Sequence, residues 1–444
     1  MKLWDKGTNE ISKEIEAYTV GRDRELDLLL APFDLYGSMA HATMLESIGL
    51  LSHDELGQLL IELKKINQTV EKNEFVIEEG IEDVHSQVEL LLTRALGDVG
   101  KKIHSGRSRN DQVLVDLRLF IRHEIQQLTS LITDLFITLN DLSKQHKDVL
   151  LPGYTHLQVA MPSSFGLWFG AYAESLTDDL QLLLAAYKIT NQNPLGSGAG
   201  YGSSFPLDRQ MTTDLLGFDD LSYNVVYAQM SRGKVEKSVA FAMSSIAATL
   251  SRMSMDICLY NSQNFGFLKL PVEMTTGSSI MPHKKNPDVF ELIRAKMNKL
   301  QVLSGEISLI TTNLPSGYHR DMQTIKETFL PAFDDLKSTL SICTFAMKKI
   351  EVKTELLEDP KYNDLFSVEE VNRLVNQGIP FREAYIQVGK AMEAGGSTLN
   401  KEVKHTHLGS IGNPANEEIE NKLQQIISAF NFEKAEQSIK NLTE

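Results

Sequence analysis

The chain has 444 residues, of which 42% are hydrophobic and 23% are charged, as in ordinary globular proteins. A chain of this length usually needs more than one hydrophobic core, so we expect two or three domains. The formal net charge of −15 argues against nucleic acid and against an anionic membrane surface as partners. Two cysteines are too few for a disulfide framework. Residues 1–6 lack the apolar core of a signal peptide. No apolar run approaches the roughly 18 residues of a membrane span. We therefore expect a cytoplasmic protein.

The first predicted element is a helix at about 52–66, where Ser52 and Glu55 have the spacing of a capping box. Farther along, apolar residues recur every three or four positions from 114 to 142, which predicts one helix of about 45 Å. Similar series cover 169–187 and 235–260. Helices of this length exceed the roughly 10–14 residues of an average helix, so we expect them to share a bundle core.

Three domains follow from this pattern. We expect an N-terminal helical domain over residues 1–105, the long-helix bundle over 106–355, and a C-terminal helical domain over 356–444. The last contains a second candidate capping box, formed by Ser367 and Glu370. Because no segment shows strong strand alternation, we predict an all-α fold of three domains with a long central helical bundle.

The loops between the predicted long helices carry the unusual side chains. They are residues 102–111, 152–158, 193–209 and 274–287. Each lies at the end of a long helix, where irregular backbone is tolerated and functional residues are common. We expect these loops to form one composite site.

The stretch from Gly277 to Pro287 contains two serines, two lysines, a histidine and an asparagine. A serine hydroxyl acts as a base only when neighbouring cations or backbone donors stabilise its alkoxide, and Lys284 could supply such a charge to Ser278. The alternative is a solvated loop that caps the following helix. The combination of side chains favours the catalytic interpretation.

A second loop gathers Arg107, Arg109 and Asn110 around a glycine. Guanidinium groups bind carboxylates bidentately, which suits a dicarboxylate ligand. The alternative is that Asn110 or Asp111 is the N-cap of the long helix and that the arginines are solvated. Both can hold, because a helix N-terminus itself attracts anions.

The remaining polar segments are less specific. His156 lies between Thr155 and Gln158, but a single histidine is more often structural than catalytic. Segment 318–326 offers polar groups of a binding type, although its residues alone favour a solvated helix surface. We expect no metal ion, since the histidines include no His-Glu-x-x-His pattern, and the glycines of 196–202 lack a nucleotide-binding pattern.

Together these segments resemble the fumarase/aspartase superfamily, whose signature loop corresponds to residues 277–287 of this chain. Within that superfamily, the run from His104 to Gln112 is similar to the argininosuccinate lyase family rather than to fumarases, aspartases or adenylosuccinate lyases. Segments 152–158, 194–199 and 318–326 agree with that family. The resemblance covers nearly the whole chain, with several motifs in the same order.

The resemblance implies a fumarase/aspartase-like lyase fold and a homotetramer built on the long-helix bundle. Each active site would be assembled from loops of three subunits. The implied reaction is the reversible β-elimination of argininosuccinate, a small-molecule dicarboxylate substrate, to arginine and fumarate in arginine biosynthesis. It needs neither a cofactor nor a metal.

The resemblance also implies residue roles. Ser278 matches the base that removes the proton beside a carboxylate, and Lys284 matches a group that stabilises the resulting dianion. His156 matches the residue that assists protonation of the leaving nitrogen, and Glu291 matches the carboxylate that orients it. The substrate-binding positions are matched by Arg109, Asn110, Thr155, Ser279, Asn286, Tyr318, Gln323 and Lys326.

Three positions depart from the family pattern. Asp23 stands where a serine near the N-terminus is usual, and His283 stands where glutamine is usual. Segment 227–234 lacks the usual Ser-Asp-Arg-Asp, although it contains Arg232. The departures leave open a lyase of the same superfamily that acts on a different N-succinyl amine. A catalytically silent structural scaffold is the third alternative, against which the retained catalytic positions speak.

Overall fold

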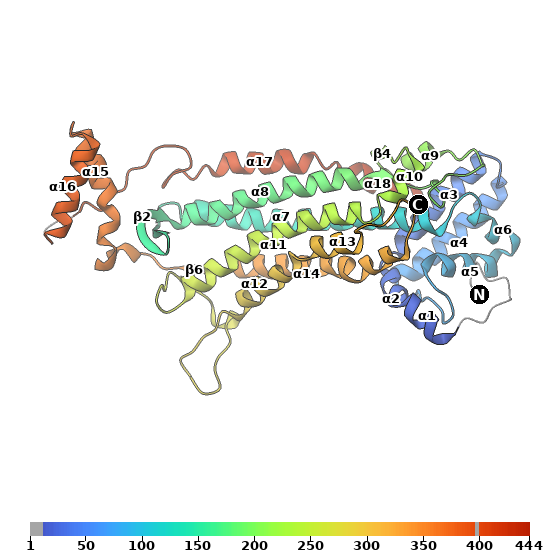
Figure 1. The fold of residues 1–444 in the computed structure, drawn as a ribbon, viewed down its shortest axis with the longest axis horizontal. Coiled ribbons are helices and arrows are strands. Elements are labelled where there is room, and N and C mark those ends of the chain that lie inside the picture. Colours follow the sequence, from blue (N-terminus) through green and yellow to red (C-terminus); the bar gives the residue numbers. More distant parts are fainter. Residues whose placement is uncertain (1–11, 396–398) are drawn as a thin grey trace.

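The computed structural model of the chain describes residues 12–395 and 399–444 (Figure 1). Residues 1–6, where we predicted no signal peptide, lie outside this part. The molecule is elongated, with long helices along its length, the helices of residues 13–101 at one end and those of residues 367–393 projecting at the other (Figure 1). Helices dominate the described residues, which confirms the predicted all-α class.

The predicted long helices are present and form a central bundle. Its elements are α7 (Arg109–Gln145), β1 (Leu150–Thr155), β2 (Gln158–Ser164), α8 (Phe165–Thr190), β3 (Gln192–Asn193), α9 (Arg209–Leu215), β4 (Asp220–Leu221), α10 (Val225–Met230), α11 (Lys234–Asn261), β5 (Leu268–Lys269), η3 (Val272–Met274), α12 (Asp288–Leu300), α13 (Leu303–Ile310), η4 (Arg320–Thr324), α14 (Ile325–Met347) and β6 (Glu351–Val352). α7 packs against α8 and α14, while α11 packs against α8, α12 and α13. The apolar series of α7 is buried in this bundle: Ile121, Ile125, Leu128 and Ile132 have no exposed surface. α7 has 37 residues and is therefore about 55 Å long, because it begins before the apolar series does.

The N-terminal region packs around a separate hydrophobic cluster that includes Leu35, Leu59 and Leu92. Its elements are α1 (Lys13–Val20), α2 (Asp23–Leu26), η1 (Asp27–Leu29), α3 (Ala31–Ser47), α4 (His53–Glu71), α5 (Val84–Leu96), α6 (Asp98–Lys101) and η2 (Lys102–His104). The predicted capping box of α4 is confirmed. The Ser52 hydroxyl accepts a hydrogen bond from the Glu55 N–H at 3.2 Å, and the Glu55 carboxylate accepts one from the Ser52 N–H at 3.0 Å.

The C-terminal region divides between the two ends of the molecule. Its elements are η5 (Leu356–Glu358), η6 (Pro360–Phe366), α15 (Ser367–Asn376), α16 (Phe381–Glu393), α17 (Asn416–Ser428) and α18 (Phe432–Thr443). The predicted capping box of Ser367 and Glu370 is wrong, because η6 runs directly into α15 and Ser367 already has helical backbone angles. α17 returns along α7 and α8, and its Leu423 is fully buried in the core of the bundle. The three domain boundaries stay a prediction.

Among the described residues, strands form only three short pairs. β1 and β2 make an antiparallel hairpin beyond the end of α7, whereas β3–β4 and β5–β6 have two residues per strand. None of the helices in the described ranges has both the length and the apolar character needed to cross a membrane.

Candidate active site

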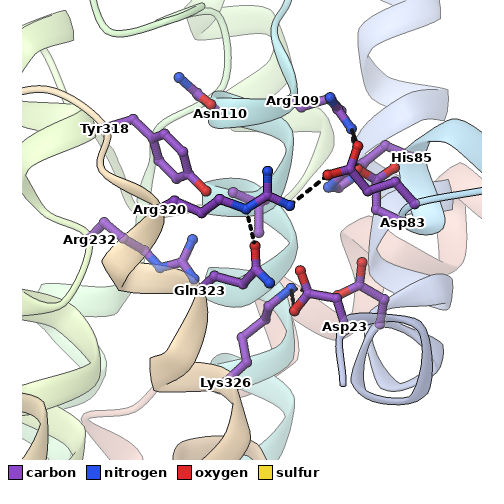
Figure 2. A pocket seen from close by; sticks show the side chains of 13 residues that line it. Asp23, Asp83, His85, Arg109, Asn110, Arg232, Tyr318, Arg320, Gln323 and Lys326 are labelled. Atoms are coloured by element: carbon purple, nitrogen blue, oxygen red, sulfur yellow. Dashed lines mark hydrogen bonds and ion pairs between the residues drawn. The ribbon is translucent and has the colours of Figure 1, made fainter. Parts of the chain in front are cut away.

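A polar pocket of about 150 Å³ lies where the N-terminal helices meet the beginnings of α7 and α14 (Figure 2). Its lining residues are Asp23, Asp27, Glu82, Asp83, His85, Arg109, Asn110, Val113, Arg232, Tyr318, Arg320, Gln323 and Lys326. Five of the predicted substrate-binding residues therefore lie together: Arg109, Asn110, Tyr318, Gln323 and Lys326. They come from the first turn of α7, the loop before η4, η4 itself and α14.

Arg109 and Asn110 stand at the start of α7, whose N-cap is Ser108. The Ser108 hydroxyl accepts a hydrogen bond from the Asn110 N–H at 3.2 Å, and the Asp111 carboxylate accepts one from the Ser108 N–H at 2.8 Å. The alternative that placed the N-cap at Asn110 or Asp111 is wrong, because Ser108 has the extended backbone of a cap and the other two are already helical. Asn110 is consequently free to present its side chain to the pocket (Figure 2).

Asp111 connects the start of α7 to the glycine-rich loop. Its Oδ2 atom accepts hydrogen bonds from the N–H groups of Gly196 at 2.9 Å and Gly198 at 2.8 Å. Both glycines have positive φ angles, 82° and 61°, which let these N–H groups converge on one oxygen. Burial raises the pKa of Asp111 to about 6, although the N–H donors act to lower it. The glycine-rich loop thus holds a carboxylate of the chain itself and fixes the turn that carries Arg109.

Two arginines share one carboxylate in the pocket. Arg109 Nη1 lies 2.6 Å from Asp83 Oδ2 and 3.3 Å from Glu82 Oε2, while Arg320 Nη2 lies 2.7 Å from Glu82 Oε1. Burial alone would raise the pKa of Glu82, but the guanidinium groups of Arg320 and Arg109 lower it overall. Both arginines are thereby held at fixed positions beside the cavity.

Lys326 is buried between two carboxylates. Its Nζ atom lies 2.8 Å from Asp23 Oδ1 and 2.7 Å from Asp27 Oδ1. Burial opposes the charge of Lys326, but the two carboxylates outweigh it and raise the lysine pKa. Burial raises the pKa of Asp23 to about 6, despite the neighbouring ammonium group. Two carboxyl groups thus face a single ammonium group in this corner of the pocket.

His85 lies in the pocket wall above a buried acidic pair. Its Nδ1 atom is 2.7 Å from Asp34 Oδ1 and 3.5 Å from Asp116 Oδ2. Among the described residues, these three form the one group whose ligand atoms are close enough to hold a metal ion. Burial alone would lower the pKa of His85, but the carboxylates raise it to about 9. A protonated ring pairs with both carboxylates, and a metal ion would bind here only by displacing that proton.

Sequence reasoning missed several residues of this pocket: Asp27, Glu82, Asp83, His85 and Arg320. Asp27 is embedded in an apolar run, so the sequence gives no sign that it lines a pocket. Glu82, Asp83 and His85 form a compact charged segment immediately before α5, which is an available signal. Arg232 also lines the pocket, so segment 227–234 contributes its arginine to it.

Thr155 and His156 lie elsewhere, at the tip of the β1–β2 hairpin. Both are exposed, and Thr155 pairs with Gln158 across a two-residue turn. His156 and Leu157 have φ angles of 53° and 58°, so both central residues adopt the left-handed conformation of a type I′ turn without being glycine. Such backbone costs about 1–3 kcal/mol per residue and is typical of functional sites.

The predicted signature loop projects from the side of the bundle before α12 (Figure 1). Its ends are joined by paired backbone hydrogen bonds between Thr276 and Asn286, at 3.3 and 2.9 Å. The Ser278 hydroxyl oxygen accepts hydrogen bonds from the N–H groups of Met281 at 3.2 Å and Ile280 at 3.4 Å. Donors of this kind favour an anionic oxygen. Ser279 and Lys284 are exposed on the same loop.

The predicted site residues therefore form three groups in one chain: those of the polar pocket, those at the tip of the hairpin, and those of the signature loop with Glu291. The pocket group begins at Arg109, whereas the hairpin with His156 follows the other end of α7, about 55 Å away. Within the described ranges, neither a hydrogen bond nor an ion pair joins His156 to Glu291, which lies in the first turn of α12. One chain cannot bring these groups to a single substrate molecule.

Comparisons of the sequence with known proteins identify the family of the chain. A family model described as lyase matches residues 2–302, which is more than half of the chain. The argininosuccinate lyase of Parabacteroides distasonis is 65% identical over 441 residues, which cover 99% of each chain. The argininosuccinate lyase of Bacteroides thetaiotaomicron is 64% identical over 441 residues, again with 99% of each chain covered. The chain belongs to the argininosuccinate lyase family.

Solved structures with this fold include an EDDS lyase variant with bound fumarate. Its TM-score is 0.74 at 21% sequence identity, and the match covers 98% of this chain and 94% of the other. At this identity the likeness concerns the fold alone. The likeness confirms the helical, fumarase/aspartase-like fold that the sequence predicted.

Proposed function

We propose that the chain is an argininosuccinate lyase, which cleaves argininosuccinate reversibly to arginine and fumarate in arginine biosynthesis. The polar pocket is the observation that carries this proposal. Four carboxylates and four Arg or Lys side chains line it, which suits the zwitterionic arginine part of the substrate. The sequence identity to named argininosuccinate lyases supports the same reaction.

The catalytic roles belong to the same proposal. Ser278 removes the proton beside a substrate carboxylate, and the N–H groups of Ile280 and Met281 stabilise its alkoxide. Lys284 and Asn286 stabilise the dianion that develops, and loss of one such donor typically lowers the rate by about a hundredfold to a thousandfold. His156 assists protonation of the leaving nitrogen.

The remaining assigned residues complete this proposed site. Glu291 orients the His156 ring, and Thr155 and Ser279 contact the substrate. The five pocket residues hold the arginine part. No cofactor or metal takes part in the proposed chemistry.

The test is fumarate release, followed by its ultraviolet absorbance, from argininosuccinate and from a panel of other N-succinyl amines. The wild type is compared with Ser278→Ala and His156→Ala, and with Ser338→Ala as a control on the exposed face of α14. We expect turnover that collapses in the first two variants only. Turnover of another amine in place of argininosuccinate would contradict the substrate assignment. Full activity of Ser278→Ala would contradict the mechanism.

We further propose a homotetramer in which each active site takes its three residue groups from three subunits. The separation of Arg109 and His156 by the length of α7 supports this, because loops of other copies can supply what one chain keeps apart. The exposed side chain of Ile280, 83% accessible, is available for such contacts.

Mixing variant subunits tests the composite site. Ser278→Ala and Arg109→Gln tetramers are each expected to be nearly inactive. Reassembled from an equal mixture, they should regain about a quarter of the wild-type activity, since one in four sites draws both groups from intact copies. Recovery that stays at the level of the separate variants would contradict shared sites. Light scattering of the wild type independently gives the number of subunits.

We also propose that the protein works in the cytoplasm. Cys258 and Cys343 are both free thiols, and Cys343 is buried. Free thiols are usual in a reducing compartment and support this location. Fractionation of the source cells tests it.

A further inference from the structure

The base of the signature loop, residues 277–287, is held by a chain of three side chains. Thr276 directly precedes the loop, and Asp288 follows it as the first residue of α12. The Thr276 hydroxyl donates a hydrogen bond to the Asp288 carboxylate. Its oxygen accepts a hydrogen bond from Asn286 Nδ2 at 3.3 Å. Neither Thr276 nor Asp288 has a role in the reaction proposed above, whereas Asn286 does.

The order of these hydrogen bonds decides how the Asn286 amide is oriented. A hydroxyl group has a single hydrogen to donate, and an ionised carboxylate can only accept. Because Thr276 donates to Asp288, its oxygen is left to accept, and Asn286 must turn its NH2 group toward it. The negative charge of Asp288 is favoured by its place in the first turn of α12. Asp288 therefore fixes the direction of the whole chain of hydrogen bonds.

This orientation leaves the second N–H of the Asn286 amide available to a substrate. Within the described ranges, the Asn286 side chain forms no other hydrogen bond to the protein. The two orientations of an amide side chain have nearly the same shape, so packing alone does not choose between them. A flip would replace both N–H groups on this side by the carbonyl oxygen. That oxygen would repel the dianion which, in the proposed reaction, Asn286 stabilises.

We propose that Thr276 is a positioning residue for the lyase reaction, which keeps the N–H of Asn286 directed at the developing dianion and is itself oriented by Asp288. This role rests on the proposed function, because the contact of Asn286 with the dianion belongs to it. Thr276 acts through Asn286 and needs no contact with the substrate. Since the amide matters only once negative charge has developed, loss of the Thr276 hydroxyl lowers kcat and leaves KM nearly unchanged.

Steady-state fumarate release from argininosuccinate tests this role in a double-mutant cycle. Thr276→Val keeps the shape of the side chain and should lower kcat by about tenfold, whereas Thr276→Ser keeps the hydroxyl and should stay near the wild type. Asn286→Ala should lower kcat by about a hundredfold to a thousandfold. Adding Thr276→Val to Asn286→Ala should cause no further loss, because Thr276 acts only through the amide. Thr275→Val is the matched control and should keep kcat, since the Thr275 hydroxyl donates to the Val272 carbonyl instead, at 3.0 Å.

Asp288→Ala tests the chain of hydrogen bonds from its other end. It frees the Thr276 hydroxyl to donate to the amide oxygen, which favours the flipped amide, and should also lower kcat by about tenfold, with no effect when Asn286 is already alanine. Thermal unfolding shows that each variant folds. A normal kcat in Thr276→Val and Asp288→Ala, an equal loss in Thr275→Val, or losses that multiply in the double variants would overturn the role of Thr276 and leave the lyase function intact. A wild type without turnover would overturn the proposed function, and a fully active Asn286→Ala would overturn the role of Asn286; either result removes the role of Thr276 with it.

Discussion

The ammonium nitrogen of Lys326 lies 2.8 Å from Oδ1 of Asp23, the residue that stands where the family resemblance led us to expect a serine. Asp27 already supplies a carboxylate to the same ammonium group at 2.7 Å. Asp23 therefore adds a negative charge that the lysine does not need. Because burial raises the pKa of Asp23 to about 6, this charge is present above that pH and lost below it. The substrate's α-ammonium group is a suitable partner for it.

Replacing Asp23 by Asn should consequently change the pH dependence of substrate binding. In the wild type, KM should rise as the pH falls through about 6, because protonation of Asp23 removes the attraction for a cation. In Asp23→Asn, KM should be about tenfold higher at pH 7 and lose this inflection, while kcat changes little. Steady-state kinetics between about pH 5 and 8 measure this. An inflection in KM that remains in Asp23→Asn would exclude Asp23 as its source.

His85 should stabilise the fold through its charge. It is the nearest cation to Asp34 and Asp116, so His85→Gln should lower the free energy of unfolding by about 3–5 kcal/mol at pH 7. The pKa of His85 is raised to about 9, above that of an unfolded histidine. Its contribution is therefore fully present below about pH 6.5 and lost as the pH rises through about 9.

Denaturant unfolding at several pH values checks this contribution. The decline in wild-type stability between about pH 6.5 and 9 should be much smaller in His85→Gln. His53→Gln is the matched control, since the His53 side chain is 90% exposed, and it should leave both stability and pH dependence unchanged. An equal decline in His85→Gln and the wild type would assign the pH dependence to another group.

Gly166 allows α8 to pack closely against the end of α7. A Cβ atom there would lie 2.4 Å from Lys147 Cα and 2.9 Å from the Ser143 carbonyl oxygen. Gly166→Ala should therefore lower stability by about 2 kcal/mol or more, although alanine is the better helix former. Gly57→Ala on the exposed face of α4 meets no atom within 4 Å and should instead raise stability by about 0.5–1 kcal/mol. Thermal unfolding of both variants measures the difference, and a stabilised Gly166→Ala would show that the backbones can separate without cost.

Two variants in the turn of the β1–β2 hairpin distinguish the effect of backbone strain from the effect of the imidazole. Leu157→Gly should raise stability by about 1 kcal/mol, because glycine adopts its φ of 58° without strain, and activity should remain. His156→Gly relieves similar strain at a φ of 53° but should lose activity. Thermal unfolding and fumarate release, measured on the same samples, test the pair. Activity lost equally in both variants would attribute it to turn geometry rather than to the imidazole.

The sequence predicted the long helices well because their apolar spacing repeats over many turns and depends on no distant residue. The N-cap of α7 was misplaced, since Ser108, Asn110 and Asp111 are all good caps and only backbone geometry distinguishes them. The hairpin was read as a loop because His156 and Leu157 are not the residues that a type I′ turn usually has.

The residues of the polar pocket also divide into those that the sequence predicts and those that it does not. Arg109, Asn110 and Lys326 were predictable from the family motif. Glu82 was not predictable. It forms an ion pair with Arg320, which is 238 positions away in the sequence, and such a pair exists only after folding. In the proposed homotetramer, the match of the whole site to a substrate depends in addition on how copies of the chain associate.

α7 also limits how this protein can change over evolution. It connects Arg109 to the hairpin through 37 uninterrupted helical residues. One residue inserted near its middle would rotate everything beyond by about 100° and shift it by about 1.5 Å. The far half of the buried stripe and the hairpin with His156 would then be turned away from their present orientation relative to Arg109. Insertions and deletions among relatives should therefore accumulate in loops, while the length of this helix stays constant.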